Sequence, residues 1–290
     1  KGYRLAAVRA QQILQDIAMP IKKTDKDLLA KIARTAMTGK GAEIARESLA
    51  NLAVEAVTKV TYEKEGGFEV ERENIRMDTR AGQDVEDSTL FEGLLIDKAR
   101  VHSGMPKTVD DARILLFNAP IEIRDTETDA RITITDPSQM EAFLEQEEKM
   151  IKSMVDKIVK IGANVVFCQK GIDDLAQHFL AKHGIVAMRR VKKSDMDMLA
   201  RATGARTITN LDDARPADLG EAGRIEEQKI EDEYVTQVKD CKNKDVVTVL
   251  LHAGTEHIVE EVERAMVDAI GDLSAAIRTG FIVGGAGAPE

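Results

Sequence analysis

Two hydrophobic patterns alternate along the chain, and together they predict a mixed α/β protein with helical flanks around an α/β centre. In the flanks, apolar residues recur every three or four positions, which predicts amphipathic helices over residues 1–16, 43–59 and 256–277. Pro20 ends the first helix, and Thr24 with Asp27 predicts the cap of a further helix that carries Leu28, Leu29, Ile32 and Ala33. Shorter extended patterns at residues 75–77 and 89–97 predict strands.

The centre contains short apolar runs that are typical of strands buried in a sheet. They lie at residues 113–117, 165–168 and, past the centre, 246–251. Residues 161–195 predict a complete unit of strand, turn, amphipathic helix and second strand, with glycines at the turn and at the helix end. A helix over residues 194–202 and short strands at 207–209, 224–228 and 281–283 follow. The unit at 161–195 has no evident catalytic residues, which favours a role in binding or movement.

Residues 122–148 are strongly acidic, with nine carboxylates against two arginines. From residue 138 onward they merge into a long predicted helix, with Asp136 as N-cap, Pro137 at its first position and an apolar stripe from Met140 to Val159. One interpretation is a surface helix whose stripe lies in the core. The other is a protruding arm whose first apolar residues contact another subunit or a non-native protein; these residues are Ile132, Ile134, Met140, Phe143 and Leu144.

Length and composition limit the number of domains and the classes of partner that are expected. A length of 290 residues predicts two or three compact units. A net charge of −10, 3% aromatic residues and no Trp argue against a nucleic-acid partner. No apolar run is long enough for a membrane span, so no membrane partner is expected. The two cysteines, Cys168 and Cys241, are far apart, which indicates reduced thiols in a cytoplasmic protein.

Several motifs suggest chemistry but are incomplete. Thr38-Gly39-Lys40-Gly41 resembles part of a phosphate loop, yet it lacks the earlier glycine and the hydroxyl residue that would hold magnesium. The histidine pairs 178/183 and 252/257 are five residues apart, which separates them by about 140° on a helix, so no metal site is predicted. Cys168 is predicted to be a core residue, and the basic run at residues 189–193 a solvated edge.

Five segments together resemble the group II chaperonins, the family of the archaeal thermosome and its eukaryotic cytosolic relatives. They are TGKGAE at 38–43, ITDP at 134–137, FLEQEEKM at 143–150, ANVVFCQKGIDDLAQHFLAKHGI at 163–185 and RRVKKSDM at 189–196. The resemblance extends over nearly the whole chain. It implies an α/β apical domain with a helical protrusion, inserted into a mainly helical intermediate domain with a small sheet.

The resemblance also implies domain boundaries. The intermediate domain would comprise residues 24–98 and 246–280, and the apical domain residues 99–245, with the protrusion at about 122–152. Residues 1–23 and 281–290 resemble stubs of an equatorial domain. A chain that starts within a helix and ends in a glycine-rich turn is therefore expected to be a fragment.

For the full-length subunit, the resemblance implies an ATP-dependent protein-folding chaperone that assembles into a double ring. Asp268 resembles the catalytic aspartate that activates the attacking water, and Thr38, Gly39 and Lys40 resemble the nucleotide-sensing segment. Gly285 and Gly287 resemble a nucleotide-binding turn, although Ala286 stands where a third glycine is usual. ATP and Mg²⁺ would be the cofactors.

Clients, meaning non-native proteins, would bind the apical helix and the neighbouring loop at residues 102–107. The implied client-binding residues are Met105, Asp173, Asp174, Gln177, His178 and Lys182, although Leu175, Phe179 and Leu180 of the same helix could all be core. The acidic segment resembles the built-in lid.

The chain lacks the phosphate-gripping GDGTT and LGPKG strings of the family. The 290 residues alone are therefore predicted to bind ATP poorly and to hydrolyse it negligibly. The alternative function is a free-standing holdase or interaction module of apical type with no ATP cycle. A small-molecule α/β enzyme is disfavoured, since no convergent set of acid, base and nucleophile is present.

Overall fold

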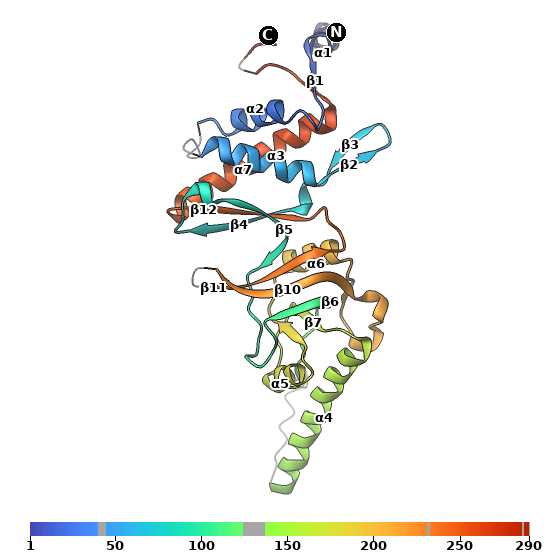
Figure 1. The fold of residues 1–290 in the computed structure, drawn as a ribbon. Coiled ribbons are helices and arrows are strands. Elements are labelled where there is room, and N and C mark those ends of the chain that lie inside the picture. The colour runs from blue at the N-terminus through green and yellow to red at the C-terminus, as the bar shows by residue number, and fades with distance from the viewer. Residues whose placement is uncertain (40–44, 124–136, 231–232, 286, 290) are drawn as a thin grey trace. The chain divides into compact units, whose positions relative to one another are not determined.

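The chain forms two compact units in the computed structural model, which describes residues 1–39, 45–123, 137–230, 233–285 and 287–289 (Figure 1). The first unit comprises Lys1–Phe91 and Val247–Glu290, and the second comprises Glu92–Val246. Each unit has its own hydrophobic core. Because the chain leaves the first unit once and returns to it once, the second unit is an insertion within the first.

Helices hold more residues of the first unit than its strands do. They are α1 (Gly2–Ile17), α2 (Lys26–Ala36), α3 (Arg46–Lys59) and α7 (Glu256–Thr279). Figure 1 shows α2 and α3 beside α7, and the contact is lined by alanines such as Ala33, Ala53 and Ala269, which are fully buried. Small side chains let the three helices approach closely. By contrast, α1 buries none of its residues in the described structure.

The strands of the first unit are short. β4 (Ile75–Ala81) runs parallel to β12 (Val247–Ala253), and β2 (Thr61–Lys64) forms a hairpin with β3 (Gly67–Val70). β1 (Met19–Pro20) pairs with β13 (Phe281–Ile282). The 3-10 helices Arg72–Asn74 and Val85–Asp87 flank β4, and β5 (Thr89–Ile96) then leads into the second unit. Two of these strands, β4 and β12, continue the sheet order through β5.

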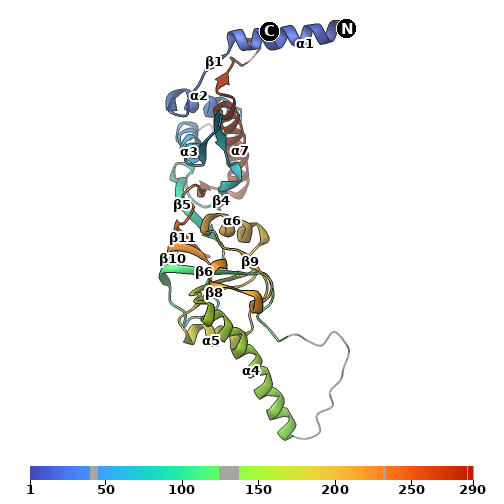
Figure 2. The same cartoon turned by 90° about the vertical axis from the view of Figure 1, so that its right-hand side faces the viewer.

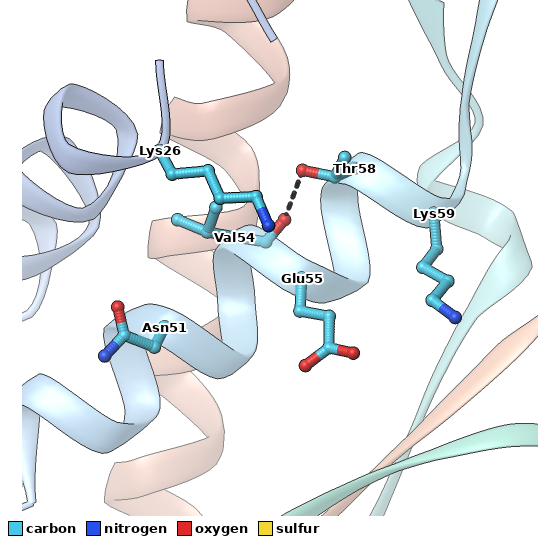
Figure 3. A pocket seen from close by; sticks show the side chains of 6 residues that line it. All are labelled: Lys26, Asn51, Val54, Glu55, Thr58 and Lys59. Atoms are coloured by element: carbon cyan, nitrogen blue, oxygen red, sulfur yellow. Dashed lines mark hydrogen bonds between the residues drawn. The ribbon is translucent and has the colours of Figure 1, made fainter. Parts of the chain in front are cut away.

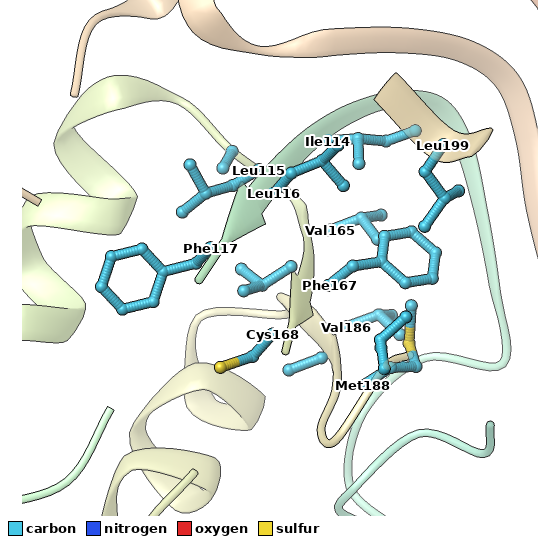
Figure 4. Close-up of a cluster of buried hydrophobic side chains, with 14 of the residues drawn as sticks. Ile114, Leu115, Leu116, Phe117, Val165, Phe167, Cys168, Val186, Met188 and Leu199 are labelled. Carbon is cyan, nitrogen blue, oxygen red and sulfur yellow. The ribbon is translucent and has the colours of Figure 1, made fainter. Parts of the chain in front are cut away.

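The second unit is built on a mixed sheet. Its strands are the end of β5, β6 (Thr108–Phe117), β7 (Val165–Cys168), β8 (Val186–Met188), β9 (Thr207–Ile208), β10 (Gly220–Ile230) and β11 (Glu233–Cys241). β5, β11, β10 and β6 are antiparallel neighbours, whereas β6, β7 and β8 run parallel, and β9 is parallel to the end of β6. Figure 4 shows the apolar side chains of β6, β7 and β8 meeting in the core.

The described part of the second unit contains the α-helices α4 (Pro137–Ile161), α5 (Asp174–Lys182) and α6 (Lys193–Thr203). The 3-10 helices Leu211–Asp213 and Pro216–Asp218 connect β9 to β10. In Figures 1 and 2, the N-terminal half of α4 extends beyond the sheet that its C-terminal half packs on. This half of the helix has the form of an arm.

Most predicted elements are confirmed, and the mixed α/β class is correct. The unit at residues 161–195 folds as β7, α5, β8 and the start of α6. Three predictions failed at polar segments: the β2–β3 hairpin and β11 were missed, and β10 is twice as long as expected. Their charged residues hide the alternation that marks a strand, and the pairing of β10 with β11 extends both. The N-cap of α2 is Asp25 rather than Thr24.

Candidate functional site

The helix α5 and the loop at residues 102–107 lie side by side on the second unit. Asp173 caps α5, because its Oδ1 accepts a hydrogen bond from the Leu175 N–H at 2.8 Å. On the next turn, the His178 ring meets the His102 ring edge to face, with centroids 6.1 Å apart. Helix and loop therefore share one surface, as the resemblance implied.

Hydrogen bonds and one buried side chain hold the loop at residues 102–107 in place. Arg100 Nη1 donates to the Met105 carbonyl at 2.7 Å, and the Gly104 N–H donates to His102 Nδ1 at 3.0 Å. The Met105 side chain points inward, is only 2% exposed, and its sulfur accepts the Ala187 N–H at 3.4 Å. The prediction that Met105 contacts clients is therefore wrong: it anchors the loop to the core.

The prediction that Gln177 contacts clients is wrong for the same reason, because its side chain is buried. Its side chain is 5% exposed, and its amide nitrogen donates to the Ile172 carbonyl at 2.8 Å and to Asp174 Oδ1 at 3.0 Å. It thus fastens the first turn of α5. Of the predicted polar residues, Asp174, His178 and Lys182 are exposed and Asp173 is half-buried.

The apolar residues of α5 are mostly core. Leu180 is fully buried, while Leu175 and Phe179 are half-buried and pack against the core cluster. The surface available to a partner is therefore chiefly polar, with two partly exposed apolar side chains beside it.

The apolar stripe of α4 divides into two halves. Ile151, Val155 and Ile158 are buried in the core, whereas Phe143 is 41% and Leu144 55% exposed. The first interpretation, a stripe that lies in the core, is therefore confirmed for these three residues of the C-terminal half, whereas contact of the exposed residues with another chain stays a prediction. Ile132 and Ile134 lie outside the described residues, as does the side chain of Met140.

The predicted catalytic residue, Asp268, lies on the exposed side of α7. Its neighbours one turn away, Arg264 and Asp272, are exposed too, whereas Ala265 and Ala269, at the border of the exposed side, are buried. Its carboxylate is thus accessible to a partner outside the helix bundle.

Thr38 and Gly39 end the α2 segment, and both are exposed. The Thr38 hydroxyl donates to the Arg34 carbonyl at 3.0 Å, and Gly39 has a φ of +76°, which glycine adopts without strain. Lys40 lies outside the described residues, so the nucleotide-sensing prediction remains untested at its main residue.

The glycine-rich segment near the C-terminus forms a tight turn. The Ala288 N–H donates to the Gly285 carbonyl at 3.2 Å, and Gly287 has a φ of +79°. A Cβ placed on Gly285 would meet no atom within 4 Å, so the space beside it is open. Ala286 is outside the described residues.

A hollow of about 490 Å³ lies on the polar side of α3, lined by Lys26, Asn51, Val54, Glu55, Thr58 and Lys59 (Figure 3). These residues carry no signal in the sequence that marks a site, since their pattern is that of the ordinary polar face of a helix. The Thr58 hydroxyl is engaged with the Val54 carbonyl at 2.6 Å. Cations and one carboxylate share the lining, and no convergent acid, base and nucleophile set is formed.

Neither cysteine is placed for nucleophilic chemistry. Burial raises the thiol pKa of Cys168, and likewise that of Cys241, from an ordinary value of 9.0 to about 11. Cys168 Sγ donates to the Ala119 carbonyl at 3.2 Å, and both thiols are free. The prediction that Cys168 is a core residue in the reduced form is confirmed.

Two other features are absent from the described part of the chain. It contains no group of three or more His, Cys, Asp or Glu side chains placed to hold a metal ion. None of its helices combines the length and apolarity needed to cross a membrane.

Several curated proteins are similar to this chain over its whole length. The chain is 54% identical over 290 residues to a thermosome subunit of Methanopyrus kandleri and 57% identical over 289 residues to thermosome subunit beta of Methanothermobacter thermautotrophicus. Each match covers 100% of this chain and 53% of the relative, so the chain spans about half the length of the curated relatives it matches.

A solved structure is also similar. The open state monomer of a group II chaperonin from Methanococcoides burtonii superposes with a TM-score of 0.85 and 42% sequence identity, covering 99% of this chain and 66% of that one. The sequence profile described as the TCP-1/cpn60 chaperonin family matches residues 1–290. Every described part of both units is therefore accounted for by one family, and the chain belongs to the TCP-1/cpn60 chaperonins.

Proposed function

We propose that this chain is the client-binding and lid-forming part of an ATP-dependent group II chaperonin subunit that folds proteins in the cytoplasm. The observation that carries the proposal is the divided stripe of α4, which leaves Phe143 and Leu144 exposed on an arm whose base is buried. Exposed apolar side chains at the tip of a well-anchored helix are suited to contact with another protein. The thermosome subunits named above support it through their similarity over the whole chain.

In this proposal the second unit, Glu92–Val246, corresponds to the apical domain and α4 to its protrusion. The first unit corresponds to the intermediate domain together with the two equatorial stubs, residues 1–23 and 281–290. The insertion of the second unit within the first is what an apical domain inserted into an intermediate domain requires.

Clients are proposed to contact the α5 surface through Asp174, His178 and Lys182, with the capping Asp173 at its edge. These side chains carry both charge signs and lie beside the partly exposed Phe179. A mixed surface of this kind binds unfolded segments weakly, so that a movement of the domain can release them.

The residues of the first unit fit a nucleotide only in part. Asp268 offers an exposed carboxylate, and the turn at Gly285 and Gly287 offers open space for close approach. Bound Mg-ATP would supply a γ-phosphate for transfer to water, and Asp268 would orient that water. Thr38, Gly39 and Lys40 would report the nucleotide. No phosphate-gripping loop occurs in the chain, so the ATP site is incomplete here.

Client capture can be tested by delaying the aggregation of a denatured protein. Exchanging the charges on α5, with Asp174→Lys and Lys182→Glu together, is expected to abolish most of the delay. The matched control is Glu221→Lys with Lys242→Glu, which exchanges an exposed ion pair of 3.3 Å elsewhere in the same unit. Equal activity of both double variants would remove α5 from the client-binding surface.

The ATP part has a separate test. Isothermal titration of the 290-residue chain is expected to show no tight magnesium-dependent ATP binding. In a polypeptide of the relatives' full length, Asp268→Asn should lower kcat by about 10²-fold or more while ATP still binds. A full-length polypeptide that captures clients but hydrolyses no ATP would instead favour the holdase alternative.

A further inference from the structure

Two histidine rings meet at the edge of the surface proposed for clients, one on the loop and one on α5. The rings of His102 and His178 are edge to face, with an interplanar angle of 71° and centroids 6.1 Å apart. His102 is half-buried and His178 is exposed. Because these two rings, the ring pair, bridge the loop and the helix, a change in their charge acts on both.

The loop holds the His102 ring in its neutral form. The Gly104 N–H donates to His102 Nδ1 at 3.0 Å, so this nitrogen carries a lone pair and not a proton. The ring lies close because residue 104 has no side chain: a Cβ there would be 3.1 Å from Nδ1 and 3.8 Å from the Ala181 Cβ on α5. Protonation of Nδ1 would therefore remove a hydrogen bond at the point where the loop lies against the helix.

The charged groups around the ring pair are poorly placed to neutralise it. The ionisable side chains of residues 100–107, of α5 and of the β10 residue that binds the loop are Arg100, Lys107, Asp173, Asp174, Lys182, His183 and Glu227. Asp173 caps α5, and Asp174 accepts a hydrogen bond from the Gln177 amide. Glu227 pairs with Arg100. β8, which also packs on this segment through the Val101 N–H and the Ala187 carbonyl, has no ionisable side chain. The three carboxylates are thus already engaged by other groups.

The base of the loop is fastened by bonds in which no histidine takes part. Glu227 Oε2 pairs with Arg100 Nε at 3.3 Å, and Glu227 Oε1 accepts the Arg100 N–H at 3.0 Å. At the other end of the loop, the Glu227 N–H donates to the Lys107 carbonyl at 2.8 Å. Both ends therefore stay attached to β10 whatever the charge of the ring pair, and only the tip at residues 102–104 depends on that charge.

We propose that the ring pair is an acid-sensitive switch: when His102 and His178 take up protons, the tip of the loop opens away from α5. Histidine is the side chain that ordinarily changes charge between pH 5 and 8. Two cations at this separation repel each other, and the contact that opposes the repulsion, the bond from the Gly104 N–H, is lost in the same step. The open surface has two additional positive charges and should bind basic client segments more weakly. This effect on clients rests on the proposed function, whereas the opening does not.

Amide hydrogen exchange, followed by NMR on the ¹⁵N-labelled chain, tests the opening directly. Protection of the Gly104 N–H, corrected for the intrinsic exchange rate at each pH, should fall severalfold between about pH 8 and about pH 5. The Glu227 N–H at the base of the loop is the internal control and should keep its protection. Constant protection of Gly104, or an equal fall at Glu227, would overturn the proposal.

Two substitutions identify the residue responsible. An asparagine side chain accepts a hydrogen bond from the N–H two residues further on and takes up no proton, so His102→Asn should keep the protection of Gly104 but lose its pH dependence. His183→Asn is the matched control, because His183 is an exposed histidine that ends α5 outside the pair. A fall that persists in His102→Asn, or one that disappears in His183→Asn, would contradict the assignment to the ring pair.

Client capture separates this switch from the proposed function. The delay in aggregation of a basic denatured protein should shorten severalfold from about pH 8 to about pH 5 with the unaltered chain. It should change little with the double variant His102→Asn, His178→Asn. A chain that delays aggregation at neither pH would refute client binding, and hydrogen exchange would still decide the switch. Equal shortening by both chains would overturn the effect on clients.

Discussion

The two longest helices, α4 and α7, have nearly the same length and the same amphipathic pattern, yet their surroundings differ. α7 buries its stripe from Val259 to Ile277 against α2, α3 and the strands of its unit. α4 buries only the part from Ile151 onward and leaves Phe143 and Leu144 exposed. A periodic stripe thus predicts that a helix forms, but not how much of that helix has a neighbour to pack on. In a chaperonin, the uncovered half is where interaction with another chain is to be expected.

The largest effect is expected in the covered stripe of α7. Leu273→Ala removes a fully buried side chain and should lower the free energy of unfolding of the first unit by about 2–5 kcal/mol. Val267→Ala, on the exposed side of the same helix at 49% exposure, should change it by less than about 0.5 kcal/mol. Urea unfolding followed by circular dichroism measures both, and equal losses would contradict the assigned faces.

The same comparison within α4 should give a divided result. Ile158→Ala, at a fully buried position, is expected to cost about 2–4 kcal/mol, whereas Leu144→Ala should leave stability within about 0.5 kcal/mol. Leu144→Ala should nevertheless shorten the delay of client aggregation. If instead it destabilised the chain as much as Ile158→Ala, the arm would have a covered apolar face.

Thiol reactivity can distinguish the buried core of the second unit from the exposed arm of α4. At pH 8, the raised pKa values of Cys168 and Cys241 should make both react with a disulfide reagent about 100-fold more slowly than an exposed thiol. A thiol placed on the arm by Leu144→Cys should react at the exposed rate. Equal rates at all three positions would mean that the second unit opens readily.

The pH dependence of stability follows from the same shift. Because the folded-state pKa of each thiol is raised, the unfolded chain loses its thiol protons first as pH rises. The two thiols should therefore stabilise the fold fully below pH 9 and lose that contribution between about pH 9 and 11. The Cys168→Ala variant, compared with the unaltered chain by urea unfolding at several pH values, should show a shallower decline.

The smallest effect is expected at the glycines that follow the C-terminal ends of α4 and α7. Gly162 follows α4 with a φ of +86°, and Gly280 follows α7 with a φ of +72°. Alanine at either position should cost about 1 kcal/mol in thermal unfolding, since both require a left-handed backbone. Gly254→Ala is the control, because its φ lies outside that range and its Cβ would meet no atom within 4 Å. A cost confined to Gly280 would show that α4 ends differently.

Much of the fold was readable from local pattern. The glycines ended the predicted helices, and the apolar runs at β6, β7 and β12 marked buried strands, because burial on both faces requires an unbroken apolar segment. β11 was missed and β10 was predicted too short because their stability comes from pairing with each other, with β5 and with β6, which a single segment does not reveal.

For the candidate sites, sequence alone determined the residue types and their order: the polar residues of α5, Asp268 within α7, and the acidic residues at the start of α4. Only the tertiary structure decided that Met105 and Gln177 are buried, that His102 meets His178, and that the stripe of α4 is covered in one half alone. The physical reason is the distance along the chain over which each effect acts. Helix periodicity and capping act within a few residues, whereas burial depends on which distant segments pack against a face, and no local pattern specifies them.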